Sequence, residues 1–211
     1  MKAQKYLLTG LIPLTLVLSS CSGEASNESN HSETIQKENN IQIVEKSVDV
    51  NWTAYKTTDK LPVKGVFSDT KIETQFNKGT SPEEILNDAT FKIDVSNLST
   101  GNADRDIKLK TLFFGIMEDS GNISGQLSYS NNEWSVNLTM NGATIKVPVN
   151  TTFENNEFHL KSNIKIGEFN ALTMLDNLNK ACFELHKGAD GISKTCEEVD
   201  VEATISFKPQ A

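Results

Sequence analysis

The most constraining feature of this sequence is a series of alternating segments joined by short Asn-rich turns between residues 123 and 166. In one of these segments, Trp134, Val136, Leu138 and Met140 occupy every second position, as in a strand with one buried face. The segments meet at three dipeptides whose residues tolerate the positive φ of a tight hairpin turn, namely Asn131-Asn132, Asn141-Gly142 and Asn155-Asn156. This pattern predicts antiparallel hairpins, with neighbours in sequence also neighbours in space.

The alternation continues on both sides of this region and gives about eight strands. Residues 48–54 and 198–207 alternate clearly, and residues 63–76 form another extended stretch. In that stretch the apolar phase shifts between Phe67 and Ile72, which predicts a β-bulge. An antiparallel sheet of this size has exposed edges unless it closes. The sequence therefore predicts an all-β, antiparallel, eight-stranded lipocalin-like barrel with two or three short helices.

Three segments interrupt the strands and are expected to be helical. Ser81 and Pro82 suit the N-cap and first position of a short helix. A second helix follows Asn102 or Asp104, either of which is a suitable cap. Its apolar side carries Ile107, Leu109, Leu112 and Phe113. The residue pattern fits a charged, capped connector between two strands, and equally a plug packed against an apolar surface. Residues 169–185 have helical spacing and are expected to lie across an open end or a flank of the sheet.

The N-terminus has the features of a targeting segment. Residues 1–20 combine a basic start with an apolar run of 13 residues, 6–18, which predicts a signal peptide. The last residues of this segment, Leu18-Ser19-Ser20-Cys21, resemble a bacterial lipobox, with Cys21 as the lipidated residue; the alternative is an ordinary signal with a cysteine beside its cleavage site. Residues 21–42 are predicted to be this lipidated cysteine and a flexible linker, because they contain little apolar sequence to bury. We expect an exported protein of the cell envelope, lipid-anchored to a bacterial membrane on its periplasmic or outer-membrane side.

Other chemistries find little support. Cys182 and Cys196 are separated by 13 residues, and in an exported protein this predicts a disulfide, with two buried thiols as the alternative. No metal site is predicted, because none of the histidines pairs with another at ligand spacing: His31, His159 and His186. No nucleophile motif is present, so we predict neither an enzyme nor a cofactor. The net charge of −8 argues against nucleic acid as a partner.

The central helical segment carries a resemblance to a known family. The run Thr100-Gly101-Asn102-Ala103-Asp104-Arg105-Asp106, with Leu109 and Phe113-Phe114 after it, resembles the most recognisable segment of the YceI-like family of small bacterial lipid-binding proteins. Residues 48–56 with Lys64-Gly65-Val66-Phe67 resemble that family's opening hairpin, and residues 138–142 with 146–149 resemble its late hairpin. The resemblance covers residues 43–207 and implies a barrel domain over 43–208 whose interior binds an isoprenoid or related lipid tail. Residues 169–196 resemble an insertion of a lipoprotein-type branch of the family.

We therefore expect a membrane-anchored lipoprotein that carries an apolar lipid inside a barrel. The alternatives are a barrel filled by its own side chains that works through its outer surface and, less favoured, an enzyme acting on a bound lipid. Arg105 could hold a lipid head group or form an ion pair with a neighbouring acid. The aromatic candidates could equally be core residues. The predicted ligand contacts are Trp52, Phe67, Phe91, Arg105, Leu109, Phe113, Phe114, Trp134 and Leu138.

Overall fold

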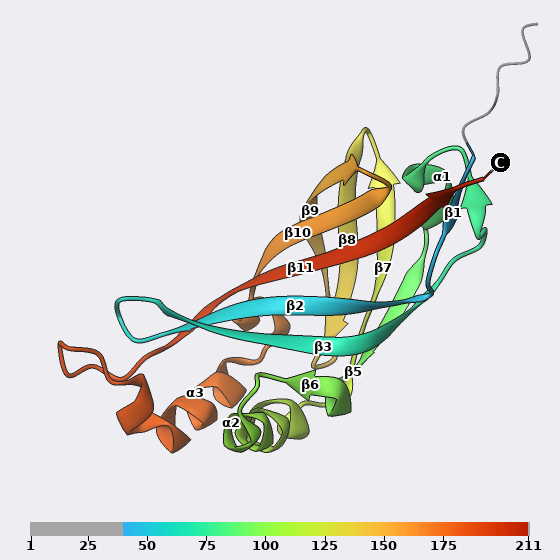
Figure 1. Ribbon diagram of the computed structural model, residues 1–211. Coiled ribbons are helices and arrows are strands. Elements are labelled where there is room, and N and C mark those ends of the chain that lie inside the picture. The colour runs from blue at the N-terminus through green and yellow to red at the C-terminus, as the bar shows by residue number, and fades with distance from the viewer. Residues whose placement is uncertain (1–39, 211) are drawn as a thin grey trace, which may run out of the picture. The chain divides into compact units, whose positions relative to one another are not determined.

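The computed structural model describes residues 40–210, and within them eight antiparallel strands close into a barrel (Figure 1). The strands follow the order β10-β9-β8-β7-β5-β3-β2-β11, and β11 pairs back onto β10. This confirms the predicted barrel. The predicted signal peptide, Cys21 and most of the predicted linker lie outside the described residues. The barrel strands are β2 (Ser47–Lys56), β3 (Leu61–Glu73), β5 (Thr90–Asp94), β7 (Asn122–Ser130), β8 (Glu133–Met140), β9 (Ala143–Glu154), β10 (Glu157–Lys165) and β11 (Thr195–Pro209).

Three short strands extend this sheet. The strand β1 (Ile41–Ile43) pairs with the last residues of β11 and with β4 (Lys78–Gly79). The strand β6 (Leu98–Ser99) pairs with β3. The fifteen-residue β11 therefore pairs with three partners, β10, β2 and β1.

The turns and the bulge form where the sequence places them. All six residues of the three predicted turn dipeptides have φ between 51° and 72°, as a primed hairpin turn requires. Between β2 and β3, Val48 lies opposite Thr70 but Val50 lies opposite Phe67, so β3 holds one extra residue. Asp69 adopts φ 57° at this bulge, and its backbone N–H donates to Oδ1 of Asp49 at 3.2 Å. The predicted break in phase between Phe67 and Ile72 is thus a β-bulge.

The helical segments are α1 (Pro82–Leu86), η1 (Val95–Asn97), α2 (Ala103–Lys108), the π-helical turn η2 (Leu109–Phe113), η3 (Phe114–Ile116), η4 (Ile166–Phe169), α3 (Leu172–Ala181) and η5 (Phe183–His186). Ser81 caps α1 by accepting a hydrogen bond from the N–H of Glu84. Asn102, rather than Asp104, caps α2, because its Oδ1 accepts from the N–H of Arg105 at 2.9 Å. None of the described helices is long and apolar enough to cross a membrane.

The two ends of the barrel differ. The helix α1 lies with β1 and β4 at one end, and α2 and α3 lie side by side at the other, which we call the helical end (Figure 1). A buried cluster that includes Leu86, Phe158 and Phe207 fills the α1 end. A second cluster lies inside the barrel next to the helical end and includes Trp52, Phe67, Phe113 and Phe114. Ile107 does not join the apolar side expected for α2, because 59% of its surface is exposed.

Candidate functional site

The barrel encloses a cavity of about 220 Å³. All eight barrel strands contribute to its wall, and η2, η3, η4 and α3 also contribute side chains. Nearly all of the lining is aliphatic or aromatic; the one lining lysine, Lys161, pairs its exposed ammonium with Glu202 at 3.2 Å. A cavity with so few polar partners holds water poorly. It is also smaller than typical ligand pockets of roughly 300–1,000 Å³, which suits a slender apolar chain.

Two pairs of aromatic and glycine residues keep the cavity open. Trp52 lies directly across from Gly65 in the β2–β3 ladder, and a Cβ added to Gly65 would be 2.2 Å from Cζ2 of the indole. Phe91 lies across from Gly125 in the β5–β7 ladder, where an added Cβ would be 2.5 Å from Cζ of the ring. Each ring therefore lies over the backbone of its partner glycine. Any larger residue at Gly65 or Gly125 would displace the ring.

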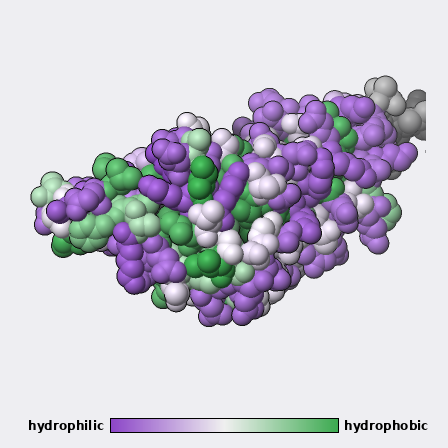
Figure 2. All heavy atoms as spheres, turned by 90° about the horizontal axis from the view of Figure 1, so that it is seen from below, coloured by the Kyte–Doolittle hydropathy of each residue, from purple (hydrophilic) through white to green (hydrophobic). Residues whose placement is uncertain are grey.

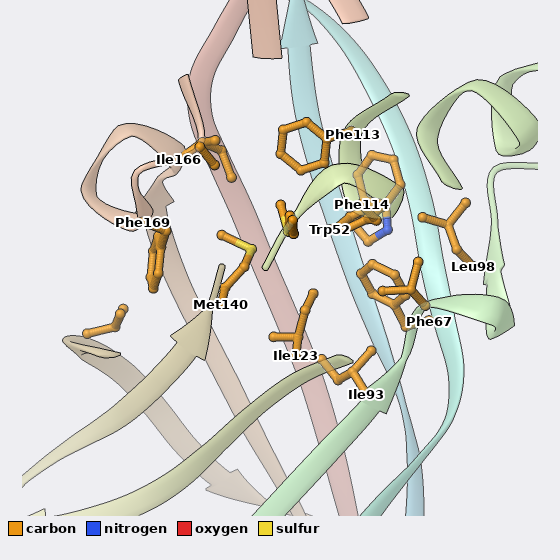
Figure 3. Close-up of a cluster of buried hydrophobic side chains, with 14 residues drawn as sticks. Trp52, Phe67, Ile93, Leu98, Phe113, Phe114, Ile123, Met140, Ile166 and Phe169 are labelled. Carbon is orange, nitrogen blue, oxygen red and sulfur yellow. The ribbon is translucent and has the colours of Figure 1, made fainter. Parts of the chain in front are cut away.

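The central helical segment closes the cavity with two consecutive aromatic residues. In a regular α-helix, neighbouring side chains point about 100° apart, yet Phe113 and Phe114 are only 5% and 8% exposed and both line the cavity. The π-helical turn before them, followed by a 3₁₀ turn, changes the direction of the backbone and allows this. The two rings meet edge to face with centroids 4.9 Å apart, and Phe114 lies 5.7 Å from Phe67 (Figure 3). The segment therefore packs against the barrel interior, which agrees with a plug and not with a mere connector.

Seven of the nine predicted ligand contacts line the cavity: Trp52, Phe67, Phe91, Leu109, Phe113, Phe114 and Leu138. Trp134 does not, because it lies near the α1 end and packs against Tyr129 and Phe158 with centroids 5.1 and 5.2 Å away. Arg105 does not either. Its side chain is exposed and forms no salt bridge with any described residue, so the expected ion pair with a neighbouring acid is absent from residues 40–210.

Sequence reasoning missed the part that α3 plays in the cavity. Leu175 and Leu178 face the hollow from α3. Their spacing of three residues was visible in the sequence. It did not distinguish a helix across the barrel end from one along its flank.

A polar group borders the cavity at the helical end. Thr195 lines the cavity, and its hydroxyl donates to Oδ1 of Asn179 at 3.0 Å. The same hydroxyl lies 2.7 Å from Nδ1 of His186, and because its own hydrogen is donated to Asn179, its oxygen accepts a hydrogen bond from the Nδ1–H. Burial, followed by the positive charges of Lys56, Lys108 and Arg105, lowers the pKa of His186 from 6.5 to about 4. The imidazole is therefore neutral at pH 7.

The predicted disulfide is not formed in the structure. Cys182 and Cys196 are both buried free thiols, as the alternative expectation had it. Cys196 lies in an irregular part of β11, between Thr195 and Val199, and its Sγ is 3.8 Å from the carbonyl oxygen of Thr57. A separation of 13 residues in sequence leaves the direction of the two side chains open. No group of three or more His, Cys, Asp or Glu side chains within residues 40–210 is arranged to hold a metal ion.

Comparison with known proteins identifies the family. A family model described as the YceI-like domain matches residues 40–207. The chain belongs to the YceI-like family. Among solved structures, this YceI-like chain is similar to a polyisoprenoid binding domain from Saccharophagus degradans implicated in plant cell wall breakdown, with 11% identity and a TM-score of 0.57 over 81% of this chain and 98% of that one. It is also similar to BcnA of Burkholderia cenocepacia, with 17% identity and a TM-score of 0.51 over 76% of this chain and 96% of that one. At these identities the similarity shows the fold alone. No curated protein matches the sequence.

Proposed function

We propose that this YceI-like protein binds an amphiphilic lipid, of the isoprenoid type or similar, with its apolar tail inside the barrel. The observation that carries the proposal is the apolar cavity itself, which eight strands and four helical segments line with mostly hydrocarbon side chains. A barrel filled by its own side chains would have no such space. The structurally similar domain from Saccharophagus degradans is described as polyisoprenoid binding, which supports the same class of ligand here. The proposed activity is binding and carriage, without a chemical step.

The energetics favour a tail over a polar ligand. Each 100 Å² of tail surface removed from water contributes about 2.5 kcal/mol, and part of this offsets the entropy lost on association. A polar group in the same cavity would lose its hydrogen bonds to water and find almost none in the lining. The polar head of the ligand would therefore remain at an end of the barrel.

The helical end is the proposed entrance. There η2, η3 and α3 meet the cavity through side chains such as Phe113, Leu175 and Leu178. These helical segments are not strands of the sheet, so they can separate without breaking its ladders. At the other end, Leu86 and Phe158 are at most 2% exposed and belong to a packed cluster.

The surface at the helical end suits contact with a membrane that would supply the lipid. Of the ten large hydrophobic residues that are exposed in the described part of the chain, six belong to the helical segments at this end or to the loop after η5, and a seventh begins β3. They are Leu61, Ile107, Ile116, Leu172, Phe183, Leu185 and Ile192. Figure 2 shows apolar side chains on this side between hydrophilic ones. Exposed apolar side chains that gather on one face commonly mark a protein or membrane contact.

A lipid anchor at Cys21 would hold the barrel beside that membrane. This part of the proposal rests on the signal-like residues 1–20 and on the lipobox-like sequence that ends at Cys21. Metabolic labelling with radioactive palmitate tests it in the full chain, with Cys21→Ala as the comparison. Label in the parent protein and none in the variant is the expected result, and an unlabelled parent protein would overturn the anchor.

Native mass spectrometry of the full chain tests tail binding. We expect a discrete small-molecule adduct that is released on unfolding. Ala203→Phe places a ring in the cavity and should abolish the adduct, whereas Glu202→Phe places the same ring on the outer face of β11 and should retain it. Circular dichroism checks that both variants fold. If the parent protein has no adduct and also fails to bind added farnesol, the proposed function is wrong.

A further inference from the structure

The cavity ends inside the barrel, short of the α1 end. On β9 and β11, the lining residues nearest to the α1 end are Val149 and Ile205. Their ladder partners, Trp134 and Phe158, are only 6% and 2% exposed, but they do not line the cavity. The two rings pack edge to face with their centroids 5.2 Å apart. We call Trp134 and Phe158 the aromatic floor.

A second layer of side chains fills the space between the aromatic floor and the α1 end. Leu86 of α1 and Phe207 of β11 are buried in the same cluster as the two floor residues. Phe153 lies opposite Phe158 in the β9–β10 ladder, and its ring packs edge to face against Phe207 with centroids 5.7 Å apart. An apolar chain that enters from the helical end therefore meets occupied space behind the aromatic floor.

Hydrogen bonds fix the α1 end to the barrel wall. The backbone N–H of Asp88, just after α1, donates to the carbonyl oxygen of Leu127 at 3.0 Å, and the N–H of Leu127 donates to that of Ala89 at 2.8 Å. The N–H of Tyr129 donates to Oδ1 of Asn87 at 2.8 Å. The segment after α1 is thus bonded to β7 much as a strand would be. Opening this end would break these bonds, so the α1 end is the fixed end of the cavity.

The position of the aromatic floor limits the length of the cavity. On β11 the lining residues run from Thr195 to Ile205, which corresponds to about 33 Å along a strand. Because barrel strands tilt by about 35–45°, the cavity extends for about 25 Å along the barrel axis. A longer tail would have to displace a buried ring or leave its excess in water, and neither adds to the burial of apolar surface.

We propose that the aromatic floor sets the length of apolar tail that the cavity accepts, with Phe158 as a specificity-determining residue. This inference rests on the proposed function and specifies the ligand class, namely amphiphiles whose tail ends within the barrel. Phe158 faces Ile205 across the ladder and Trp134 within the floor. Its ring is about as large as one isoprene unit, so truncation of Phe158 opens room for one more unit below the present floor.

The test measures which of two prenols the full chain binds when both are present in equal amounts, by native mass spectrometry. The pairs differ by one isoprene unit and cover the series from farnesol to solanesol. We expect the parent protein to prefer the longer member by at least about ten-fold at each step until the tail meets the floor. Beyond that step the preference should vanish or reverse.

Phe158→Ala should move this step to a prenol one unit longer. The matched control Phe76→Ala removes the same ring from the exposed loop between β3 and β4, where 54% of its surface is accessible, and should leave the step unchanged. Phe158→Leu keeps an aliphatic side chain in the cluster and serves if circular dichroism shows that Phe158→Ala does not fold. It should weaken the discrimination against the first prenol that the parent protein rejects.

Each other outcome overturns a defined part of the reasoning. A parent protein that prefers the longer prenol at every step has no limiting floor. The same step in the parent protein and in the folded Phe158 variants, or a shifted step in Phe76→Ala, would show that the ring of Phe158 does not set the tail length. Binding of no prenol at all would overturn the proposed function itself.

Discussion

The contact between Trp52 and Gly65 allows a quantitative test of how the cavity is kept open. Gly65→Ala would place a methyl group 2.2 Å from Cζ2 of the indole. Because carbon atoms in contact are normally about 3.5–4.0 Å apart, the ring must retreat by about 1.3–1.8 Å. The backbone of β3 lies behind the methyl group, so the indole moves toward the cavity and its neighbours Phe67 and Phe114.

We expect Gly65→Ala to lower the free energy of unfolding by about 2 kcal/mol, within the range of about 1–3 kcal/mol for overpacked interiors. Urea unfolding followed by far-ultraviolet circular dichroism measures this change. The displaced ring also occupies part of the cavity, so the affinity for farnesol should fall about ten-fold or more. Lys64→Ala, at the adjacent outward position, is the control and should change neither quantity.

A double-mutant cycle separates the clash from other effects of the substitution. In a Trp52→Leu background no indole lies over residue 65, so Gly65→Ala should be neutral or stabilise by a few tenths of a kcal/mol. The coupling energy between the two positions should therefore be about 2 kcal/mol. An additive cycle, or a Gly65→Ala protein as stable as the parent, would refute the proposed packing of the indole against Gly65.

Three further measurements test other parts of the structure. Asn141→Ala should lower the free energy of unfolding by about 2–3 kcal/mol. The buried amide of Asn141 accepts a hydrogen bond from the N–H of Glu118 and donates one to the carbonyl oxygen of Phe169, both at 3.0 Å. Asn131→Ala, at an exposed turn of similar φ, is the control and should cost less than half as much. Because the pKa of His186 is lowered to about 4, the unfolded chain binds a proton at higher pH than the folded protein does. The contribution of the neutral ring to the free energy of unfolding should therefore be complete above pH 6.5 and decline by about 1–2 kcal/mol down to about pH 4. A His186→Asn protein with the same pH profile of stability as the parent would contradict this. Phe183→Ser should slow transfer of farnesol from vesicles to the protein without changing its affinity in detergent, and an unchanged transfer rate would exclude this residue from membrane contact.

The sequence predicted those features that depend on local backbone preferences. Asn-Asn and Asn-Gly dipeptides adopt left-handed φ readily, and strict alternation sets which face of each strand is buried, so the hairpins and the inward residues followed directly. Trp134 shows the limit of this reasoning. Its inward face was predicted correctly, but its depth along the barrel depends on the register and tilt of all eight strands, which alternation does not determine.

The helical end was harder to predict for a related reason. Ile107 was predicted to share the apolar side with Leu109, but at about 100° per residue the two positions lie about 200° apart on a helix. Ile107 accordingly points away from the barrel and is exposed. Arg105 was recognised as a possible head-group residue, but it occupies an exposed position of α2 outside the cavity lining, which depends on how α2 packs on the barrel. That the barrel is hollow also could not be read from the sequence, because the wall of a cavity and a packed core require the same apolar residues.

The pairing of β11 has a consequence for the order of folding. This strand, the last of the described strands, pairs with β1, β2 and β10, so strands from both ends of the described chain depend on it. During folding, β2 lacks one neighbour until residues 195–203 pair with it. The barrel can therefore close only once β11 is available, through contacts between distant residues that form slowly. A folding chain of this kind remains open until β11 is in place.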